Sequence, residues 1–170
     1  MGFREIWKKK TCNDKEWIDH LRSKGVTIGE GCEIHRDVMW GSEPYLIKIG
    51  NHVRITNGCR FITHDGGVWV LREKYKNNTI DLFGMITVGN NVHIGMDSII
   101  MPGVKIGNNV IIGCGAVVTH DIPDGEVWGG VPARKIKTIE EYYEKNKDRF
   151  DMTKGYSEDE KKAYLINKYK

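Results

Sequence analysis

The sequence predicts a mainly β protein whose central segment, residues 26–137, folds as a parallel β-helix of triangular coils. Two observations predict this fold class: a six-residue hydrophobic period and a glycine that follows most of its members. The period is clearest in the second half of the chain, at Val88, Ile94, Ile100, Ile106, Ile112 and Val118. Neither an α-helix nor an ordinary strand keeps a period of six.

A six-residue unit fits a short strand that points one side chain inward and then turns a corner. Glycine follows four of these aliphatic residues, at Gly89, Gly95, Gly107 and Gly113. A corner requires residues that tolerate unusual backbone angles, and glycine is the first of these. Three units close a triangle, so residues separated by three units stack along the axis of the coil.

The same phase extends back to Ile28, which gives about four to five coils and three interior ladders. The ladders are Ile28, Ile49, Val88 and Ile106; Ile34, Ile55, Ile94 and Ile112; and Trp40, Phe61, Ile100 and Val118. Each ladder is apolar throughout, which a chance pattern would rarely produce.

Two insertions interrupt the period. Three extra residues fall within 41–45, and twenty-one fall between Phe61 and Val88, at about residues 65–85. Long loops on rigid scaffolds often carry function, so we expect the 65–85 loop to protrude and to form part of a site.

The two ends differ from the centre. Residues 1–25 are predicted to form a helical cap, with an amphipathic helix over 3–24, because an open solenoid end needs covering. After Pro132 the pattern is helical, and residues 138–170 are predicted to form C-terminal helices. Thr138 and Glu141 have the spacing of a capping box, and Ser157 has the place of a second N-cap over 157–169.

Composition limits the function classes. The 170 residues include 26 Lys and Arg and 23 Asp and Glu, for a formal net charge of +3, which gives no general attraction to nucleic acid or membranes. No apolar run is long enough to span a bilayer, and the first ten residues lack the apolar stretch of a signal peptide. The four cysteines fit no zinc spacing. We expect a cytoplasmic protein without a metal.

The hexads have the form I-G-x-x-V-x, and over residues 26–137 the chain resembles the hexapeptide-repeat acyltransferases. Residues 106–132, IGNNVIIGCGAVVTHDIPDGEVWGGVP, resemble the acetyl-CoA-binding end of galactoside and maltose acetyltransferases. Residues 41–72, with GSEPYLIKIG and FITHDGGVWVLR, resemble sugar O-acetyltransferases of capsule and surface-polysaccharide gene sets. The resemblance implies a left-handed β-helix, acetyl-CoA as acyl donor, and a homotrimer with active sites between subunits. It also implies transfer to a hydroxyl of a sugar or surface-polysaccharide precursor.

Transfer to a sugar hydroxyl needs a base, and histidine titrates near neutral pH. The resemblance assigns this role to His64, which follows Ile62-Thr63 where the long loop begins. His64 would take the hydroxyl proton while the oxygen attacks the thioester directly, without an acyl-enzyme. The resemblance places an oxyanion donor at the backbone N–H of Met96, a role that depends on geometry.

Five residues are expected to contact the acceptor. Asp65, Trp69 and Arg72 follow His64 into the loop, and an aromatic ring with charged neighbours suits a sugar. The resemblance adds His35, which takes a place where asparagine is common. It also adds His93, which replaces a common tryptophan and so leaves the shape of the acceptor pocket open.

The donor positions come from the resemblance. Gly113, Cys114 and Thr119 match pantetheine positions, where small side chains allow close approach. His120, Arg134 and Lys137 take positions that suit the CoA phosphates, although lysine is common in place of His120. The Val131-Pro132-Ala133 turn would bring Arg134 back to the end of the β-helix.

Three alternatives remain open from the sequence. The same base would serve an N-acyltransferase that acts on an amino sugar. A β-helix can also be a non-catalytic scaffold. Finally, His35, His64 and His93 are spaced evenly by twenty-nine residues, which suggests a carbonic anhydrase-like zinc site, although the close histidine pair expected there is absent.

Overall fold

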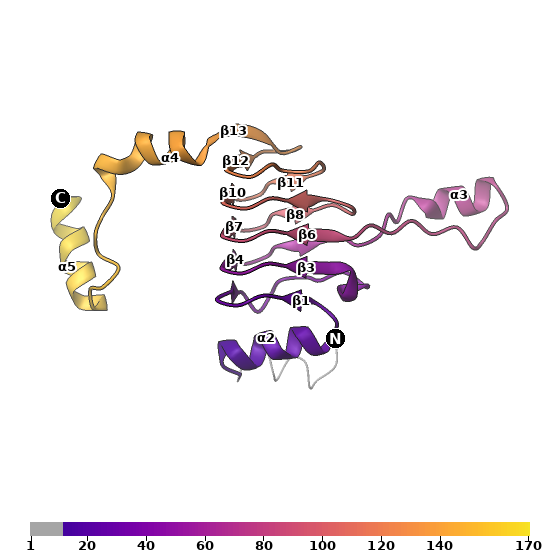
Figure 1. Cartoon of the computed structure of the whole chain (residues 1–170), viewed down its shortest axis with the longest axis horizontal. Helices are drawn as coiled ribbons and strands as arrows, with labels where there is room; N and C mark the ends of the chain where they lie inside the picture. The colour runs from indigo at the N-terminus through magenta and orange to yellow at the C-terminus, as the bar shows by residue number, and fades with distance from the viewer. Residues whose placement is uncertain (1–11) are drawn as a thin grey trace.

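The computed structural model describes residues 12–170 and has the predicted fold, a left-handed parallel β-helix (Figure 1). Short strands stack along one axis, with a helix across the N-terminal end. The long loop projects from one side, and the C-terminal helices lie on the other. Within the described residues, no helix is both long and apolar enough to cross a membrane.

Three sheets form the sides of the triangle, and we call them A, B and C. Sheet A contains β1 (Thr27–Ile28), β3 (Ile47–Ile49), β6 (Ile86–Val88) and β9 (Lys105–Ile106). Sheet B contains β2 (Glu33–Ile34), β4 (Val53–Ile55), β7 (Val92–Ile94), β10 (Val110–Ile112), β12 (Glu126–Gly129) and β13 (Arg134–Thr138). Sheet C contains β5 (Arg60–Phe61), β8 (Ile99–Ile100) and β11 (Val117–Val118).

The corners are named after the sheet that precedes them. In one central coil, corner A is Gly89–Asn91, corner B is Gly95–Asp97 and corner C is Met101–Gly103. Equivalent residues of successive coils stack at each corner, so each corner forms an edge that runs the length of the β-helix.

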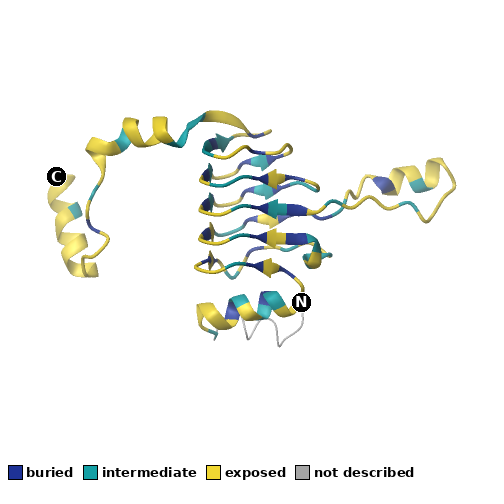
Figure 2. Cartoon of the chain, viewed as in Figure 1, coloured by how far each residue is buried: buried dark blue, intermediate teal, exposed yellow. Residues whose placement is uncertain are grey.

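The three interior ladders are confirmed. Ile49 pairs with Ile28 on one side and Val88 on the other, and Ile94 pairs with both Ile55 and Ile112. In the third ladder the rings of Trp40 and Phe61 stack in parallel planes with centroids 5.0 Å apart. Figure 2 shows buried segments repeated from coil to coil, and the buried residues form one hydrophobic cluster. Burial of this cluster supplies the main stabilising free energy of the fold.

Corner A is stabilised by a ladder of side-chain amides. The Asn51 and Asn90 backbone N–H groups donate to the side-chain oxygens of Asn90 and Asn108, at 2.8 and 2.9 Å. Coils pass so closely here that a Cβ on Gly89 would lie 2.6 Å from the Gly107 carbonyl oxygen. Corner A is therefore held together by close contacts between successive coils.

The N-terminal helix is shorter than predicted. Helix α2 spans Asp14–Ser23, and extended Asn13 caps it with a side-chain bond to the Glu16 N–H. A continuous helix over 3–24 is therefore wrong, because the cap ends the helix on its N-terminal side; residues 3–11 lie outside the described part. As expected, α2 covers the end of the coil and buries Trp17 and Leu21.

The segment after Pro132 is a strand, and the prediction of a helix there is wrong. Strand β13 pairs antiparallel with β12 after a cis Val131–Pro132 peptide bond. It covers the edge that β12 would otherwise leave open, a tertiary requirement that outweighs local preference.

The predicted caps of the C-terminal helices are confirmed. Thr138 and Glu141 form a capping box at α4 (Ile139–Asn146), and Ser157 caps α5 (Glu158–Lys168). A short 3-10 helix, η2 (Lys147–Arg149), follows α4.

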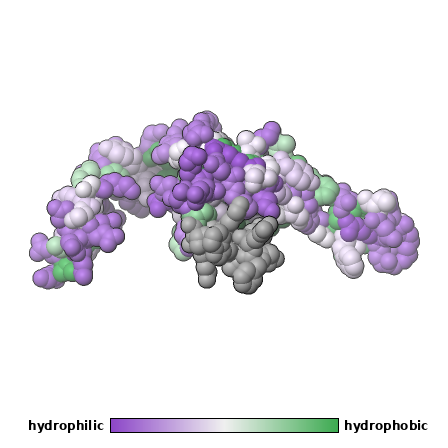
Figure 3. Space-filling view, turned by 90° about the horizontal axis from the view of Figure 1, so that it is seen from below, coloured by the Kyte–Doolittle hydropathy of each residue, from purple (hydrophilic) through white to green (hydrophobic). Residues whose placement is uncertain are grey.

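Both insertions contain helical turns. The first forms the 3-10 helix η1 (Pro44–Leu46), and the second carries α3 (Val68–Lys74) at the end of a protruding loop. Seen from the N-terminal end, the tip of this loop is largely hydrophilic, and hydrophobic side chains gather nearer the body (Figure 3). The apolar base of the loop lies beside the candidate site.

Candidate active site

His64 lies at corner C, where the protruding loop leaves the β-helix. The loop leaves and returns through a narrow two-stranded neck. The Asp65 N–H donates to the Leu82 carbonyl at 2.9 Å, and the Gly84 N–H donates to the Thr63 carbonyl at 3.0 Å. The backbone on both sides of His64 is thereby fixed, so the ring has a defined position although its side chain is 44 % exposed.

A carboxylate orients the His64 ring. The Nδ1 atom of His64 lies 3.2 Å from Oε2 of Glu43, and the Thr63 hydroxyl donates to the same oxygen at 2.5 Å. The Glu43 side chain is only 15 % exposed. The Thr63 hydroxyl, and then the His64 ring, lower the pKa of Glu43 below its ordinary value. Glu43 is thus ionised at neutral pH and favours the His64 tautomer with its proton on Nδ1.

Sequence reasoning missed Glu43, although a signal was present. The short insertion follows Trp40 and the long one follows Phe61, and these residues are neighbours in the same interior ladder. Both insertions must therefore leave from corner C on successive coils. That shared origin places Glu43 beside the start of the second loop.

Two pockets meet at His64. The polar pocket, of about 260 Å³, is lined by Glu43, His64, Asp65, Gly66, Val68, Trp69, Arg72, Asp81, Leu82 and Phe83. The apolar pocket, of about 390 Å³, lies towards the next coil and is lined mainly by Ile62, Leu82, Phe83, Met101, Pro102 and Gly103 beside His64. The Phe83 ring meets the imidazole edge to face, with centroids 6.3 Å apart. His64 is therefore accessible from two sides of different chemistry.

The three loop residues predicted to bind the acceptor all line the polar pocket. The Asp65 carboxylate accepts a bond from the Gly67 N–H at 2.7 Å and remains exposed. Trp69 presents a ring that is 75 % exposed. The Arg72 guanidinium is already bound, to the Ile80 carbonyl at 2.8 Å and to Asp81 at 2.5 Å. Arg72 therefore closes the loop on itself.

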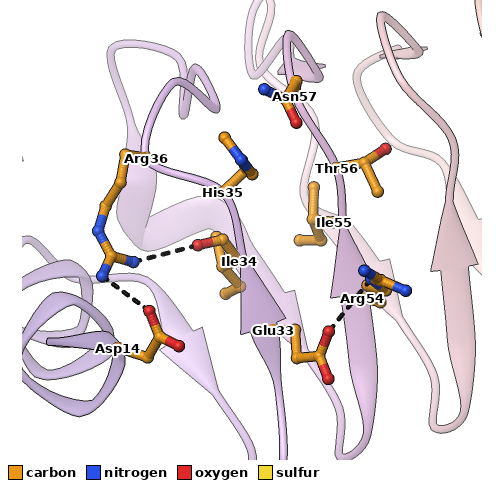
Figure 4. Close-up of a pocket in the computed structure, with 9 residues that line it drawn as sticks. All are labelled: Asp14, Glu33, Ile34, His35, Arg36, Arg54, Ile55, Thr56 and Asn57. Carbon is orange, nitrogen blue, oxygen red and sulfur yellow. Dashed lines mark hydrogen bonds and ion pairs between the residues drawn. The ribbon is translucent and has the colours of Figure 1, made fainter. Parts of the chain in front are cut away.

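His35 lies away from His64, at corner B. It lines a different pocket with Asp14, Arg36, Arg54, Thr56 and Asn57 (Figure 4). Its Nδ1 is 3.1 Å from Asp37.

His93 lies on the outer face of sheet B, between Arg54 of β4 and Ile111 of β10. Burial, and then the Arg54 charge, lower the pKa of His93. Within one chain, neither His35 nor His93 joins the His64 site.

The remaining predicted residues also divide between the corners. Met96, Gly113 and Cys114 stack at corner B, where the Gly115 N–H donates to the Met96 carbonyl at 2.7 Å. Within residues 12–170 the Met96 N–H donates no backbone hydrogen bond. Thr119 and His120 lie at corner C, above His64, and their side chains bond at 2.8 Å.

Arg134 and Lys137 lie on β13, at the C-terminal end of the coil. Across the described part of the chain, no three His, Cys, Asp or Glu side chains are grouped to hold a metal ion.

Comparison with known proteins identifies the class. The family model described as bacterial transferase hexapeptide (six repeats) matches residues 85–120. The chain is 51 % identical to Protein CapG of Staphylococcus aureus, over 99 % of this chain and 95 % of that protein. It is 33 % identical to a putative acetyltransferase, YvoF, of Bacillus subtilis, over 78 % and 72 % of the two chains. It is 42 % identical to the galactoside O-acetyltransferase of Escherichia coli K12, over 57 % and 46 %.

Comparison with solved structures gives the same fold. A maltose O-acetyltransferase from Clostridium difficile 630 superposes with a TM-score of 0.61 at 27 % identity, over 79 % of this chain and 81 % of that one. A hexapeptide-repeat acetyltransferase from Vibrio cholerae, complexed with acetyl coenzyme A, has the same fold, with a TM-score of 0.67 at 22 % identity over 79 % and 82 %. The fold and its motif define a hexapeptide-repeat transferase. With its relatives, the chain belongs to the hexapeptide-repeat acetyltransferase family and is an acetyltransferase.

Proposed function

We propose that the enzyme transfers acetyl from acetyl-CoA to a hydroxyl of a sugar or surface-polysaccharide precursor, with His64 as general base. One observation carries the proposal: Glu43 holds Nδ1 of His64, and the ring stands between a polar and an apolar pocket. A fixed imidazole with access from two sides suits a reaction that joins two substrates.

The reaction balances as a direct transfer. Nε2 of His64 takes the acceptor hydroxyl proton while the oxygen attacks the thioester carbon, and Glu43 stabilises the imidazolium that forms. When the C–S bond breaks, Nε2 returns the proton to the departing thiolate. The products are the acetyl ester and free CoA, and His64 returns to its neutral form without an acyl-enzyme.

Residues at corner B and on the last strands fit the donor. Gly113 and Cys114 are small enough to admit a pantetheine chain, and the Met96 N–H, which donates no backbone hydrogen bond within residues 12–170, would stabilise the oxyanion. Thr119 lies on the same route, and His120, Arg134 and Lys137 supply donors and positive charge for the CoA phosphates. A protein of the same fold from Vibrio cholerae forms a complex with acetyl coenzyme A, which supports the choice of donor.

A second copy of the chain is needed to complete this site. His64 lies at corner C and Met96 at corner B, on two different edges of the β-helix, and Met96 lines neither of the two pockets that meet at His64. Oxyanion donors must lie near 3 Å from the reacting atom, so both groups cannot serve one thioester within one chain. We infer that corner C of one copy faces corner B of its neighbour.

The outer faces of the sheets favour the same assembly. Sheet A presents Lys48 and Lys105 to solvent. Sheet C presents Met39, Ile99 and Val117 beside Arg60, and sheet B presents Ile111 beside Glu33, Arg54 and His93. The outer face of sheet C is the most apolar of the three, and its contact with sheet B covers it and leaves the lysines exposed. Repeated around an axis, this contact closes a homotrimer with three sites. His35 then contributes from corner B to the site of its neighbour.

The test removes the base and its partner separately. His64→Ala is expected to lower turnover by about 10²–10⁴-fold, since a proton acceptor is lost. Glu43→Gln keeps the shape of the side chain and is expected to cost about 10–100-fold through the orientation of the ring. The readout is CoA release with a panel of methyl glycosides as acceptors.

Calorimetric titration with acetyl-CoA is the control, and both variants should bind it as the wild type does. Wild-type turnover in H64A would contradict the role of the base. Failure of the wild type to bind acetyl-CoA at millimolar concentration would contradict the donor.

A further inference from the structure

The polar pocket beside His64 is acidic, and its charges bear on the acceptor. Three carboxylates, Glu43, Asp65 and Asp81, line it together with the Arg72 guanidinium. The guanidinium is bound to Asp81 and to the Ile80 carbonyl, so it offers no free charge to a ligand. Among residues 12–170, Glu43 and Asp65 have no Lys or Arg partner, so both keep their negative charge uncompensated while His64 is in the neutral form that acts as base.

From this charge balance we propose that the acceptor is a sugar with no carboxylate or phosphate beside its reacting hydroxyl, and that Asp65 enforces this selectivity. The inference rests on the proposed function, because it assigns the polar pocket to the acceptor. It names the acceptor class as neutral sugars, or amino sugars whose ammonium group is accepted without being acetylated.

The assignment of pockets follows from the stacking at corner C. The apolar pocket opens towards Met101–Gly103 of the next coil, and Thr119 and His120 lie one coil further along the same edge. These two residues are the corner-C part of the donor route, so the donor reaches His64 from the apolar side. The acceptor then occupies the polar side, where the exposed Trp69 ring provides a flat surface for a sugar.

Corner B of the neighbouring copy does not neutralise the negative charge of the polar pocket. Corner B carries Arg36, the outer face of sheet B carries Arg54 on β4, and both are already paired within their own chain. Arg36 lies 2.8 Å from Asp14, and Arg54 lies 3.1 Å from Glu33, as Figure 4 shows. The described residues of corner B therefore bring no unpaired guanidinium to the site.

The acidic pocket also favours hydroxyls over amines. Carboxylates nearby stabilise the protonated form of an amine, and an ammonium group has no lone pair to attack a thioester. A hydroxyl carries no charge and keeps its lone pairs. The pocket thus argues against the alternative of N-acyl transfer, even for an amino sugar that binds.

The first experiment compares three acceptors that differ at one position: methyl β-glucoside, its uronic acid and its 2-amino analogue. We expect kcat/KM for the glucoside to exceed that for the uronate by at least about tenfold, and added salt to narrow the gap. Asp65→Asn keeps the oxygen that accepts from the Gly67 N–H. It should reduce the ratio of kcat/KM for the glucoside to kcat/KM for the uronate several-fold. Asp148→Asn, a remote exposed carboxylate, should leave it unchanged. A uronate preferred over the glucoside, or acetylation at nitrogen, would overturn the proposal.

A second experiment needs no acceptor. Iodoacetamide and iodoacetate differ in charge and little in size, and alkylation of His64 by each is followed by peptide mass spectrometry. The alkylation rate with iodoacetamide divided by that with iodoacetate should be at least about threefold higher at His64 than for free N-acetylhistidine. D65N should lower this ratio. An equal or smaller ratio would overturn the acidic-pocket inference even if the enzyme is active. Loss of acetyl-CoA binding would instead count against the proposed function alone.

Discussion

The contacts of single side chains account for most of the chemistry. Thr63 is completely buried and donates to Glu43, and Glu43 in turn holds His64. The contacts run from the core outward, so the rigid coil fixes the Thr63 hydroxyl, the Glu43 carboxylate and the His64 ring in succession. The scaffold positions the proposed base, although its ring is 44 % exposed.

A pH effect belongs to this scale. Burial first, and Arg54 second, lower the pKa of His93 in the folded state. The unfolded chain therefore binds more protons at this residue. The contribution of His93 to the free energy of unfolding is fully present above about pH 6.5, and it is lost as the pH falls towards the lowered pKa. His93→Gln removes this contribution. We expect its melting temperature to fall less between pH 7.5 and pH 5.5 than that of the wild type.

His35→Gln is the matched control, since it removes an exposed histidine at the neighbouring corner. Equal melting-temperature changes in H93Q and H35Q would show that His93 does not carry the effect.

At the scale of the element, the coil corner sets the strictest steric requirement. Gly89 has an ordinary backbone conformation, yet a Cβ there would approach the Gly107 carbonyl oxygen to 2.6 Å. Gly89→Ala must therefore push two coils apart, at an expected cost of about 1–3 kcal/mol. Urea unfolding followed by tryptophan fluorescence measures it.

Gly155→Ala serves as the comparison, because nothing lies within 4 Å of a Cβ at that position. It should change the free energy of unfolding by less than about 0.5 kcal/mol. A G89A protein as stable as G155A would contradict the close stacking at corner A.

Some helix and strand boundaries could be predicted from nearby residues, and others could not. Thr138 with Glu141, and Ser157 by itself, were sufficient to place the starts of two helices, because capping depends on residues within one turn of the helix start. Strand β13 was missed because its only partner is the edge of β12, and an open edge is invisible in the segment that covers it. The α2 start was missed because Asn13 interrupts a pattern that is otherwise amphipathic.

At the scale of the whole molecule, the pairing of corner C with corner B of a neighbouring copy can be tested directly. His64→Ala removes the proposed base at corner C. Gly113→Phe blocks corner B, where a Cβ has ordinary contacts of 3.5 Å or more. Each variant alone should be nearly inactive. Hybrid trimers, co-expressed with two tags and purified through both, should recover about a third of wild-type activity, because each hybrid ring contains a single intact pair of corners.

Hybrids as inactive as their parents would show that each site lies within one chain. The G113A homotrimer controls for the loss of glycine itself and should remain active.

The sequence by itself determined the β-helix, its interior ladders and the position of both insertions, because each depends on a period or on adjacent residues; the proposal of His64 came from the resemblance to a family. Three things were decided only by the tertiary structure: the Glu43 contact, the engagement of Arg72 by Asp81, and the separation of His64 from Met96 and His35. The physical reason is that loops of variable length have no period. Whether a loop carboxylate meets a histidine or an arginine depends on how the coil brings two distant corners of the chain together.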